Sequence, residues 1–215
     1  MINNSIQIEI TQKPKWITYD EIADVLHDAH RATFEKGMRY SVLNQNGQDL
    51  RRRIGEDGVF FVALLNNKTL VGVTGVSFKN KSNAWYTQNK PYAEIKLVGV
   101  RSEYKGLGIY NRLQEEAYKY AFERVELLMT HTATQNTILL NNNIKRGWKF
   151  VDYLSWDSTN YYSIVMAKWR NECPYSDTYC RARFVFNKCK TKLMKTKNGE
   201  YTLVGRMIKK YIFRK

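Results

Sequence analysis

One segment decides the fold of this 215-residue chain: Ala93-Glu94-Ile95-Lys96-Leu97-Val98-Gly99-Val100-Arg101-Ser102-Glu103-Tyr104-Lys105-Gly106-Leu107-Gly108-Ile109-Tyr110. Residues 93–100 have the apolar alternation of a β-strand. Gly106 and Gly108 then precede a stretch with helical spacing. The first backbone N–H groups of a helix lack partners within the helix and lie at the positive end of its dipole. This strand–turn–helix predicts a phosphate-binding turn, although a glycine pair also forms ordinary turns.

Two common nucleotide-binding signatures are missing from this segment. The turn does not continue into Gly-Lys-Ser/Thr, the ending of the loop in nucleotide-hydrolysing proteins. No acidic residue follows at the spacing that a dinucleotide-binding fold requires. The turn therefore matches neither of these two nucleotide-binding loops.

Outward from this segment, hydrophobic periodicity predicts an α/β protein with a mixed sheet covered by helices. Strands are expected at 6–10, 59–65, 70–78, 93–100, 127–132, 148–153 and 161–169. Helices are expected at 21–37, 48–54, from 109 past 121, and 137–145. Asp20 is expected to cap the first of these helices.

Composition excludes several classes of protein. Hydrophobic residues make up 43% of the chain, too many for a disordered protein. The longest apolar run, Val59–Leu65, is far shorter than the ~20 residues that span a bilayer. The N-terminus lacks a secretory pattern, and the three cysteines have no metal-like spacing. A cytoplasmic protein is therefore expected.

The positive charge is concentrated near the C-terminus. Residues 1–169 contain 22 basic and 17 acidic side chains, whereas residues 170–215 contain 13 and 3. We therefore expect a domain over 1–169 and a basic extension over 170–215, with a basic amphipathic helix after Asn198-Gly199. Its partner is expected to be an anionic molecule or the surface of a membrane, to which the protein would attach peripherally. A solvated basic surface, docking on the first domain and pairing of two subunits are the alternatives.

Two motifs carry a resemblance to a known family. The residues Val100…Tyr104-Lys105-Gly106-Leu107-Gly108 resemble the acetyl-CoA loop of the GCN5-related N-acetyltransferases (GNAT), written Arg/Gln-x-x-Gly-x-Gly/Ala. Downstream, the stretch from Asn136 to Gly147-Trp148 is similar to the family's Asn…Gly-Phe pattern. The resemblance covers roughly residues 5–169 and implies the GNAT fold, with acetyl-CoA as cosubstrate.

The resemblance also implies where coenzyme A (CoA) binds. Backbone amides of the turn would bind the pyrophosphate, which here means Lys105, Gly106, Leu107, Gly108, Ile109 and Tyr110. Tyr110 departs from the family, where Gly or Ala is usual, so its side chain must point away from the phosphates. Val98 and Val100 would contact the pantetheine arm, and the Val98 N–H would polarise the thioester carbonyl. Both valines are also compatible with a role in the sheet core alone.

Three residues are candidates for the chemical step or for contact with CoA. Glu94 occupies the position of the general base in the histone-acetyltransferase branch of the family, and an ion pair with Lys96 is the alternative. Asn143 stands where many members have a Tyr that protonates the CoA sulfur, and an amide can only hydrogen-bond it. Asn136 is expected to contact the pantetheine arm.

The acceptor is expected to be a small molecule that receives the acetyl group on an amine or a hydroxyl, by direct transfer in a ternary complex. Aromatic side chains in the implied acceptor segments suit a sugar, and Tyr40, Trp85, Tyr86 and Tyr161 are the candidates. The basic extension adds an amino sugar of surface-polysaccharide synthesis as the hypothesis. His27 and His30 have no third ligand and His131 is read as packing, so no metal site is expected. The protein is expected to be a monomer or a homodimer.

Two other functions stay open on the sequence alone. The departures at Tyr110 and Asn143 are compatible with a CoA-binding sensor that has no catalytic activity. The basic extension is compatible with nucleic-acid binding, although no interleaved aromatic and basic motif supports sequence-specific recognition.

Overall fold

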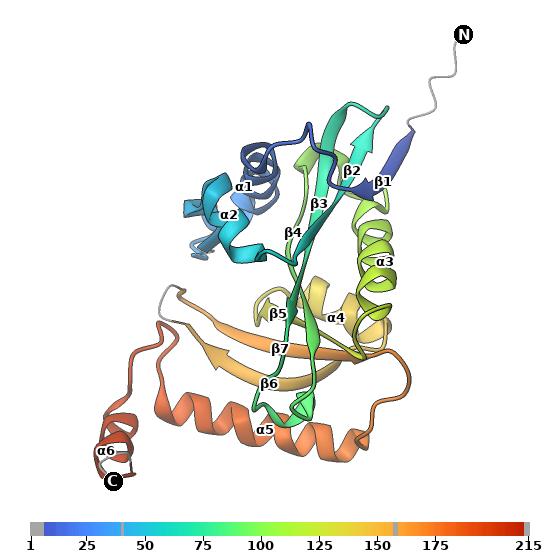
Figure 1. Cartoon of the computed structure of the whole chain (residues 1–215). Coiled ribbons are helices and arrows are strands. Elements are labelled where there is room, and N and C mark those ends of the chain that lie inside the picture. Colours follow the sequence, from blue (N-terminus) through green and yellow to red (C-terminus); the bar gives the residue numbers. More distant parts are fainter. Residues whose placement is uncertain (1–6, 40, 157–158, 213–215) are drawn as a thin grey trace. The chain divides into compact units, whose positions relative to one another are not determined.

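The structure, a computed structural model, describes residues 7–39, 41–156 and 159–212 (Figure 1). It divides into two compact units, one of residues 1–36 with 41–128 and the other of 37–40 with 129–215. The α/β fold class and the predicted order of strands and helices up to residue 169 are confirmed. The domain boundary at residue 169 lies inside the second unit and stays a prediction.

The first unit contains four antiparallel strands in the order β1-β2-β3-β4. These strands are β1 (Ile8–Gln12), β2 (Val59–Leu65), β3 (Thr69–Lys79) and β4 (Tyr92–Val100). The helical elements are α1 (Tyr19–Glu35), η1 (Ser41–Asn44), α2 (Gly47–Ile54), η2 (Trp85–Thr87), η3 (Ser102–Tyr104) and α3 (Ile109–Phe122). Helices α1 and α2 cover one face of the strands, and α3 covers the other (Figure 1).

The predicted cap of α1 was wrong. Thr18 is the N-cap, and its hydroxyl accepts a hydrogen bond from the Glu21 N–H at 3.1 Å. The Glu21 carboxylate accepts in return from the Thr18 N–H at 2.7 Å, which completes a capping box. Asp20 instead accepts from the Gly47 N–H at 2.8 Å, so it joins α1 to the start of α2.

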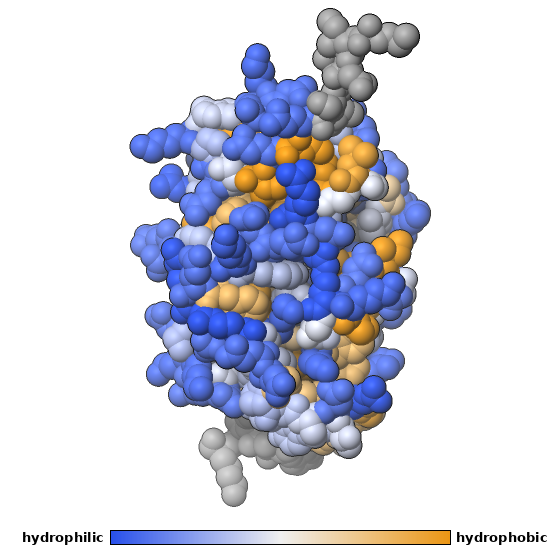
Figure 2. Space-filling view, turned by 90° about the vertical axis from the view of Figure 1, so that its right-hand side faces the viewer, coloured by the Kyte–Doolittle hydropathy of each residue, from blue (hydrophilic) through white to orange (hydrophobic). Residues whose placement is uncertain are grey.

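Polar residues dominate the outer side of α3. The helix exposes Arg112, Glu115, Glu116 and Lys119. Figure 2 shows a face on which hydrophilic residues predominate and apolar residues form only small groups. Within the ranges that the structure describes, no helix has the length and hydropathy that would let it cross a membrane.

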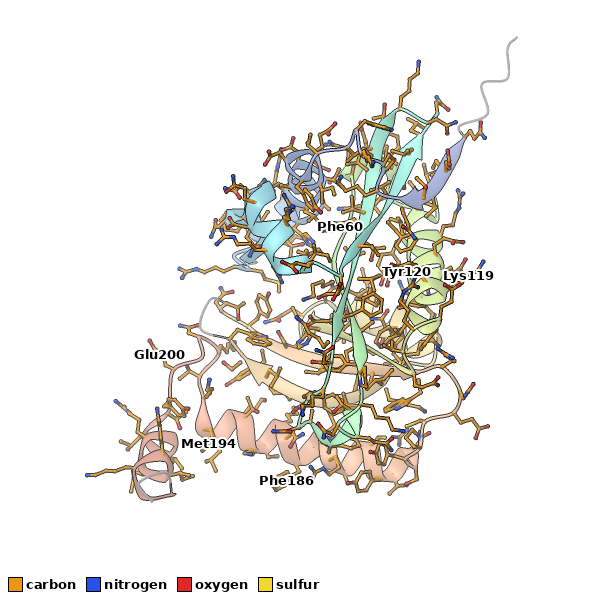
Figure 3. All side chains as sticks on the ribbon, viewed as in Figure 1. Phe60, Lys119, Tyr120, Phe186, Met194 and Glu200 are labelled. Atoms are coloured by element: carbon orange, nitrogen blue, oxygen red, sulfur yellow. The ribbon has the colours of Figure 1, made fainter. Side chains whose placement is uncertain are left out.

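The inner side of α3 packs on the sheet. The rings of Tyr120 and Phe61 meet edge-on with centroids 5.5 Å apart. Figure 3 shows Tyr120 directed toward the strands and Lys119 directed away from them. The amide of Gln114 donates to the hydroxyl of Thr74 at 3.0 Å, which satisfies two buried polar groups. Because helices cover both faces, β3 is buried from Leu70 to Ser77.

The second unit contains most of β5 and two further strands in the order β5-β7-β6. Its elements are β5 (Leu127–Ala133), α4 (Thr137–Lys145), β6 (Lys149–Ser155), β7 (Tyr162–Trp169), α5 (Asp177–Met194) and α6 (Leu203–Ile212). Strands β6 and β7 are antiparallel.

Helix α5 was not predicted from the sequence. It lies along β6, where Phe184 contacts Phe150 at 5.3 Å between ring centroids. The hydroxyl of Thr191 donates to the Tyr153 carbonyl at 2.7 Å. Lysines and arginines interrupt the apolar positions of this helix, and those positions lie on two of its sides. The sequence therefore lacks the single apolar face that indicates an amphipathic helix.

Candidate functional site

Strand β4 contains a β-bulge just before its end. Val73 pairs with Gly99, but Gly75 pairs with Lys96, so Leu97 and Val98 together stand opposite a single residue of β3. Leu97 has a φ of +53°, a left-handed conformation that is unusual for a leucine. A bulge bends its strand and changes the direction of the backbone groups. It therefore sets the orientation of Val98, the residue predicted to polarise the thioester.

Helix α1 packs closely on this bulge. A Cβ atom added at Gly99 would lie 2.9 Å from the Cβ of Ala29 and 3.1 Å from a methyl carbon of Leu26. The Nε2 of His30 donates a hydrogen bond to the Val98 carbonyl at 3.1 Å. Burial lowers the pKa of His30 against the raising effect of the bond to Val98, and the charges of Lys105 and His27 lower it further. His30 is therefore a neutral donor that supports the bulge near pH 7.

The turn after β4 is attached to the same part of α1. The Ser102 N–H donates to the Asp28 carboxylate at 2.6 Å, and this bond is the main reason that the pKa of Asp28 is lowered. The ammonium of Lys105 donates to the Ala29 carbonyl at 3.3 Å. Asp28, Ala29 and His30 thus hold the end of β4 and its turn in place. Sequence reasoning missed this role because the contacts join positions far apart in the chain.

The two glycines of the turn are required by its backbone conformation. Gly106 has a φ of +86° and Gly108 a φ of +74°. Apart from the chain neighbours of each glycine, no described atom lies within 4 Å of the position of a Cβ at either one, so the space beside them is open. Gly108 is the N-cap of α3 and provides no side-chain cap. An anion can therefore approach the N-terminus of α3 without meeting a side chain at these two positions.

The neighbours of the glycines differ in exposure. Lys105 and Leu107 are exposed, and Leu107 keeps 52% of its surface accessible. Ile109 is buried in the first unit, and Tyr110 is half-buried. The predicted turn therefore has exposed side chains before the helix and less exposed ones where the helix begins.

Glu94 lies upstream on β4 and forms an ion pair with Lys96. Both side chains are largely shielded, with 19% and 15% of their surface exposed. Burial lowers the pKa of Lys96, although the charge of Glu94 opposes this effect. Burial and the charge of Glu94 raise the pKa of Tyr92. The ion pair with Lys96, the alternative role for Glu94, is present, while the role of Glu94 as general base stays a prediction.

Asn136 and Asn143 belong to the second unit. The Asn136 side chain caps α4 by accepting from the Leu139 N–H at 3.2 Å. Asn143 is buried, and its amide nitrogen lies 3.7 Å from the sulfur of Met166. Their predicted contacts with CoA stay predictions.

The predicted acceptor residues are spread over both units. Tyr40 lies outside the described residues. Trp85 is half-buried and meets the buried ring of Tyr86 edge-on at 5.5 Å in the first unit. Tyr161 is buried in the second unit. Their roles in acceptor binding stay predictions.

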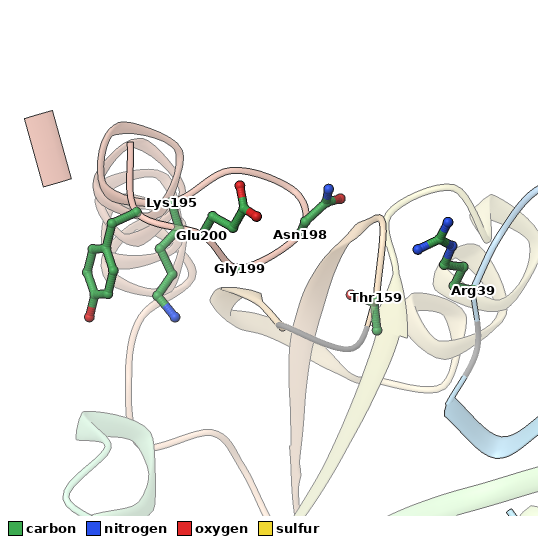
Figure 4. Close-up of a pocket in the computed structure, with 7 residues that line it drawn as sticks. Arg39, Thr159, Lys195, Asn198, Gly199 and Glu200 are labelled. Atoms are coloured by element: carbon green, nitrogen blue, oxygen red, sulfur yellow. The ribbon is translucent and has the colours of Figure 1, made fainter. Parts of the chain in front are cut away.

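A polar pocket of about 660 Å³ opens in the second unit (Figure 4). It is lined by Arg39, Thr159, Lys195, Asn198, Gly199, Glu200 and Tyr201. Figure 4 shows the polar ends of Arg39, Asn198 and Glu200 directed to the same side. Among the described residues, no ion pair is formed by Arg39 or Glu200. The pocket thus presents charges of both signs.

Hydrogen bonds from β6, β7 and the residues between them fix the walls of this pocket. The Asn160 side chain accepts from the Arg39 N–H at 3.0 Å and donates to the Gly37 carbonyl at 2.7 Å. The Tyr162 hydroxyl donates to the Lys195 carbonyl at 3.0 Å. The Ser155 hydroxyl donates to the Thr196 carbonyl at 2.5 Å. The sequence drew attention to the Asn198-Gly199 turn but not to Arg39 or Glu200, whose proximity depends on the packing of distant segments.

The fold and the end of β4 define the class of protein. A bulged strand, a two-glycine turn and a helix without a side-chain cap follow one another within the α/β fold. A profile described as the acetyltransferase (GNAT) family matches residues 19–141. This match spans more than half of the chain, so the protein belongs to the GNAT family and is an acetyltransferase that uses acetyl-CoA. The resemblance noted in the sequence is confirmed.

Several solved structures share this fold. Arabidopsis thaliana NAA60 in complex with acetyl-CoA is 17% identical, with 77% of this chain and 100% of that one covered at a TM-score of 0.57. The PaiA N-acetyltransferase of Thermoplasma acidophilum in complex with coenzyme A is 19% identical. The match covers 76% of this chain and 99% of that one, with a TM-score of 0.56. PH1933 of Pyrococcus horikoshii is 19% identical. The match covers 77% of this chain and 100% of that one, with a TM-score of 0.59. These identities show the fold alone, and no curated protein matches the chain.

His27, considered above as a metal ligand, has backbone partners. Over residues 7–39, 41–156 and 159–212, no group of His, Cys, Asp and Glu is arranged to hold a metal ion. His27 instead contacts the carbonyls of Val42 and Gln45, each at 3.1 Å. Its role in the first unit is therefore to join α1 to η1 and the residue that follows it.

Proposed function

We propose that the protein transfers the acetyl group of acetyl-CoA directly to an amine of a small acceptor while both substrates are bound. The amine nitrogen forms a bond with the acetyl carbon, the bond from this carbon to sulfur breaks, and CoA leaves as a thiolate. The observation that carries the proposal is the sequence of features at the end of β4, where a bulge at Val98 precedes a two-glycine turn and α3.

The turn and the bulge would have separate tasks. The backbone amides from Lys105 to Tyr110 would bind the pyrophosphate of CoA at the N-terminus of α3. The Val98 N–H would donate to the thioester oxygen as negative charge develops on it. Such a preformed donor contributes roughly 3 kcal/mol to other acyl transfers.

Glu94 would accept the proton that the amine loses, directly or through a water. This proton must leave because a protonated amine, with a pKa of about 10, has no lone pair to attack with. Asn143 would hydrogen-bond the departing sulfur. A thiol pKa near 8.5 makes thiolate departure at neutral pH cost only about 2 kcal/mol relative to the thiol.

A cysteine-bound acetyl intermediate has less support than direct transfer. Burial and, to a smaller extent, the nearby Cys173 raise the pKa of Cys180 to about 11. A thiol with such a pKa is almost entirely protonated near pH 7 and is therefore a poor nucleophile.

The acceptor that suits the polar pocket is an amino sugar with an anionic group. The cations of Arg39 and Lys195 can bind a phosphate or carboxylate of the acceptor, and the carboxylate of Glu200 can accept hydrogen bonds from its hydroxyl groups. A nucleotide- or lipid-linked amino sugar of surface-polysaccharide synthesis has both groups.

The proposal is tested first by CoA binding and by release of free thiol. CoA should raise the midpoint of thermal unfolding, whereas a DNA duplex should not. Glucosamine 6-phosphate should release thiol from acetyl-CoA faster than glucosamine, and N-acetylglucosamine 6-phosphate should release none. CoA binding without turnover on any amine would indicate a sensor, and stabilisation by the duplex alone would indicate a nucleic-acid-binding protein.

The role of Glu94 is tested by Glu94→Gln. We expect kcat to fall by 10²–10⁴ and the activity to lose its dependence on a group that ionises at acid pH. Lys96→Met is the matched control because it also breaks the ion pair. If Lys96→Met reduces kcat as much as Glu94→Gln does, the ion pair matters for structure and Glu94 is not the base.

A further inference from the structure

Helix α5 exposes a stripe of apolar residues on the side that faces away from β6. The exposed fractions are 45% for Tyr179, 55% for Val185, 60% for Phe186 and 52% for Leu193. Figure 3 shows Phe186 on the outer side of the helix. Ala182 and Cys189 are exposed as well. With them, positions 179, 182, 186, 189 and 193 recur every three or four residues, which places them on one helical face.

This stripe is separate from the face that builds the core of the second unit. Cys180 is buried, Phe184 contacts β6, and Thr191 donates to the β6 backbone. The helix therefore has an inner apolar face that is used in folding and an outer one that stays exposed at Val185, Phe186 and Leu193, while the ring of Tyr179 stacks on Tyr175 with centroids 5.4 Å apart. A solvent-exposed helix face of this kind usually has polar residues, so the outer stripe indicates a binding surface.

Basic side chains border the stripe on both sides. At 100° per residue, Arg181, Lys188 and Lys192 lie along one border, and Lys190 lies along the other. Asp177, at the start of the helix, is the one acidic residue of α5, and it pairs with Lys149 at 2.6 Å. The stripe together with these four cations is called the α5 surface below.

Helix α6 repeats this combination. Leu203, Val204 and Met207 are 69%, 41% and 53% exposed. Lys209 and Lys210 are exposed in its last turn. Gly205 lies against the end of α5, because a Cβ added there would be 2.1 Å from the Met194 carbonyl oxygen. The contact at Gly205 thus leaves the apolar residues of α6 exposed.

We propose that the α5 surface, assisted by α6, binds peripherally to a membrane with anionic lipids. An interfacial helix inserts its apolar face between lipids while lysine and arginine side chains reach the headgroups. At 1.5 Å per residue, the stripe from Tyr179 to Leu193 is about 21 Å long within the 18-residue helix. This proposal concerns the location of the enzyme and does not depend on the identity of the acceptor.

Two other partners fit this surface less well than a membrane: a second copy of the chain and a nucleic acid. Two copies that met through α5 would bring their basic borders together, within an extension that has 13 basic and 3 acidic residues. A nucleic acid would satisfy the cations but would leave the apolar stripe in water. An anionic membrane satisfies both features.

The test is sedimentation of the full-length protein with vesicles. We expect binding to vesicles of phosphatidylcholine with 30% phosphatidylglycerol, and at least tenfold weaker binding to pure phosphatidylcholine. The double variant Val185→Ser/Phe186→Ser should lose binding more than tenfold. Lys188→Gln and Lys192→Gln should each reduce it about fivefold, and increasing salt should reduce it further.

Ile138→Ser is the matched control, since Ile138 is 75% exposed on α4, outside the α5 surface. This variant should bind vesicles like the wild type. Light scattering and circular dichroism on all variants separate a loss of binding from dimer dissociation or unfolding. The proposal is overturned if the wild type does not bind the anionic vesicles, if Ile138→Ser weakens binding as much as the double variant, or if the double variant converts a dimer into a monomer.

Discussion

Gly106 and Gly108 show how single residues specify the predicted cosubstrate site. Both have left-handed backbone angles, and an L-residue there costs roughly 1–2 kcal/mol. No side chain closes the space next to them. The same two positions therefore permit both the turn and the close approach of an anion.

Gly108→Ala should weaken CoA binding at least tenfold, as measured by calorimetry. The new methyl group would strain the N-cap of α3 and disturb the amides of the turn. Gly55→Ala is the control, because Gly55 has a φ of +84° and equally open surroundings at the end of α2. Gly55→Ala should lose at least as much stability as Gly108→Ala, because Gly55 combines its positive φ with a ψ of 171°, a region that is essentially restricted to glycine. An equal loss of CoA affinity in the two would contradict the assignment of the turn.

His30 should make stability depend on pH in a defined window. Its pKa in the folded protein is lowered from the usual 6.5, so the unfolded chain binds a proton more readily. The free energy of unfolding should therefore decrease as the pH falls below about 6.5 and through the pKa of the folded state. The pKa of Asp28 is lowered from 3.8, so the stability that this carboxylate provides is lost only at a more acidic pH, below about 3.8.

Denaturant titrations at pH 7 and pH 5 check this expectation. His30→Gln keeps a donor for the Val98 carbonyl but cannot titrate, so its stability should change less between the two values. His131→Gln is a control for the loss of a histidine elsewhere. A wild type and a His30→Gln variant with the same pH dependence would exclude the effect.

At the scale of elements, each proposed substrate site contains a backbone segment that is held in place by residues of another segment. Helix α1 holds the bulge through His30 and the turn through Asp28. In the second unit, Asn160 holds the segment of Gly37 and Arg39 by two hydrogen bonds. The geometry of each proposed substrate site thus depends on tertiary contacts with residues that lie outside the site.

Asn160→Ala should raise the KM for the acceptor about tenfold and leave the KM for acetyl-CoA unchanged. Without the Asn160 amide, the backbone of Arg39 loses its hydrogen bond and one wall of the pocket loosens. Asn141→Ala, at an exposed position of α4, should change neither constant. Steady-state kinetics with both substrates varied checks this, and a change confined to acetyl-CoA would disprove the assignment of the pocket to the acceptor.

At the scale of the whole molecule, charge and folding are unevenly distributed along the chain. The net charge is +15, and the extension from residue 170 supplies +10 of it. This extension adds α5 to the second unit and lines the polar pocket with residues 195 and 198–201. The same segment therefore contributes to the stability of its unit, to the proposed acceptor pocket and to the proposed membrane surface.

Prediction succeeded where local signals were strong. Helix α4 has the predicted bounds, because Asn136 caps its start and Gly147 follows its end with a φ of +82°. It failed at α5, where apolar residues lie both on the face that packs on β6 and on the exposed face, so that no single apolar face marks the helix. It also misplaced the cap of α1, since Thr18 and Asp20 are both good capping residues.

The amino-acid order alone determined the strand–turn–helix and its family, because glycine conformations and apolar periodicity are local properties. Only the tertiary structure decided what supports this turn. His30 and Val98 are 68 positions apart, and the bulge at Leu97 arises where β4 pairs with β3. Arg39 and Glu200 likewise line one pocket only after distant segments pack. Such contacts depend on which elements meet, and no local preference of the chain encodes that.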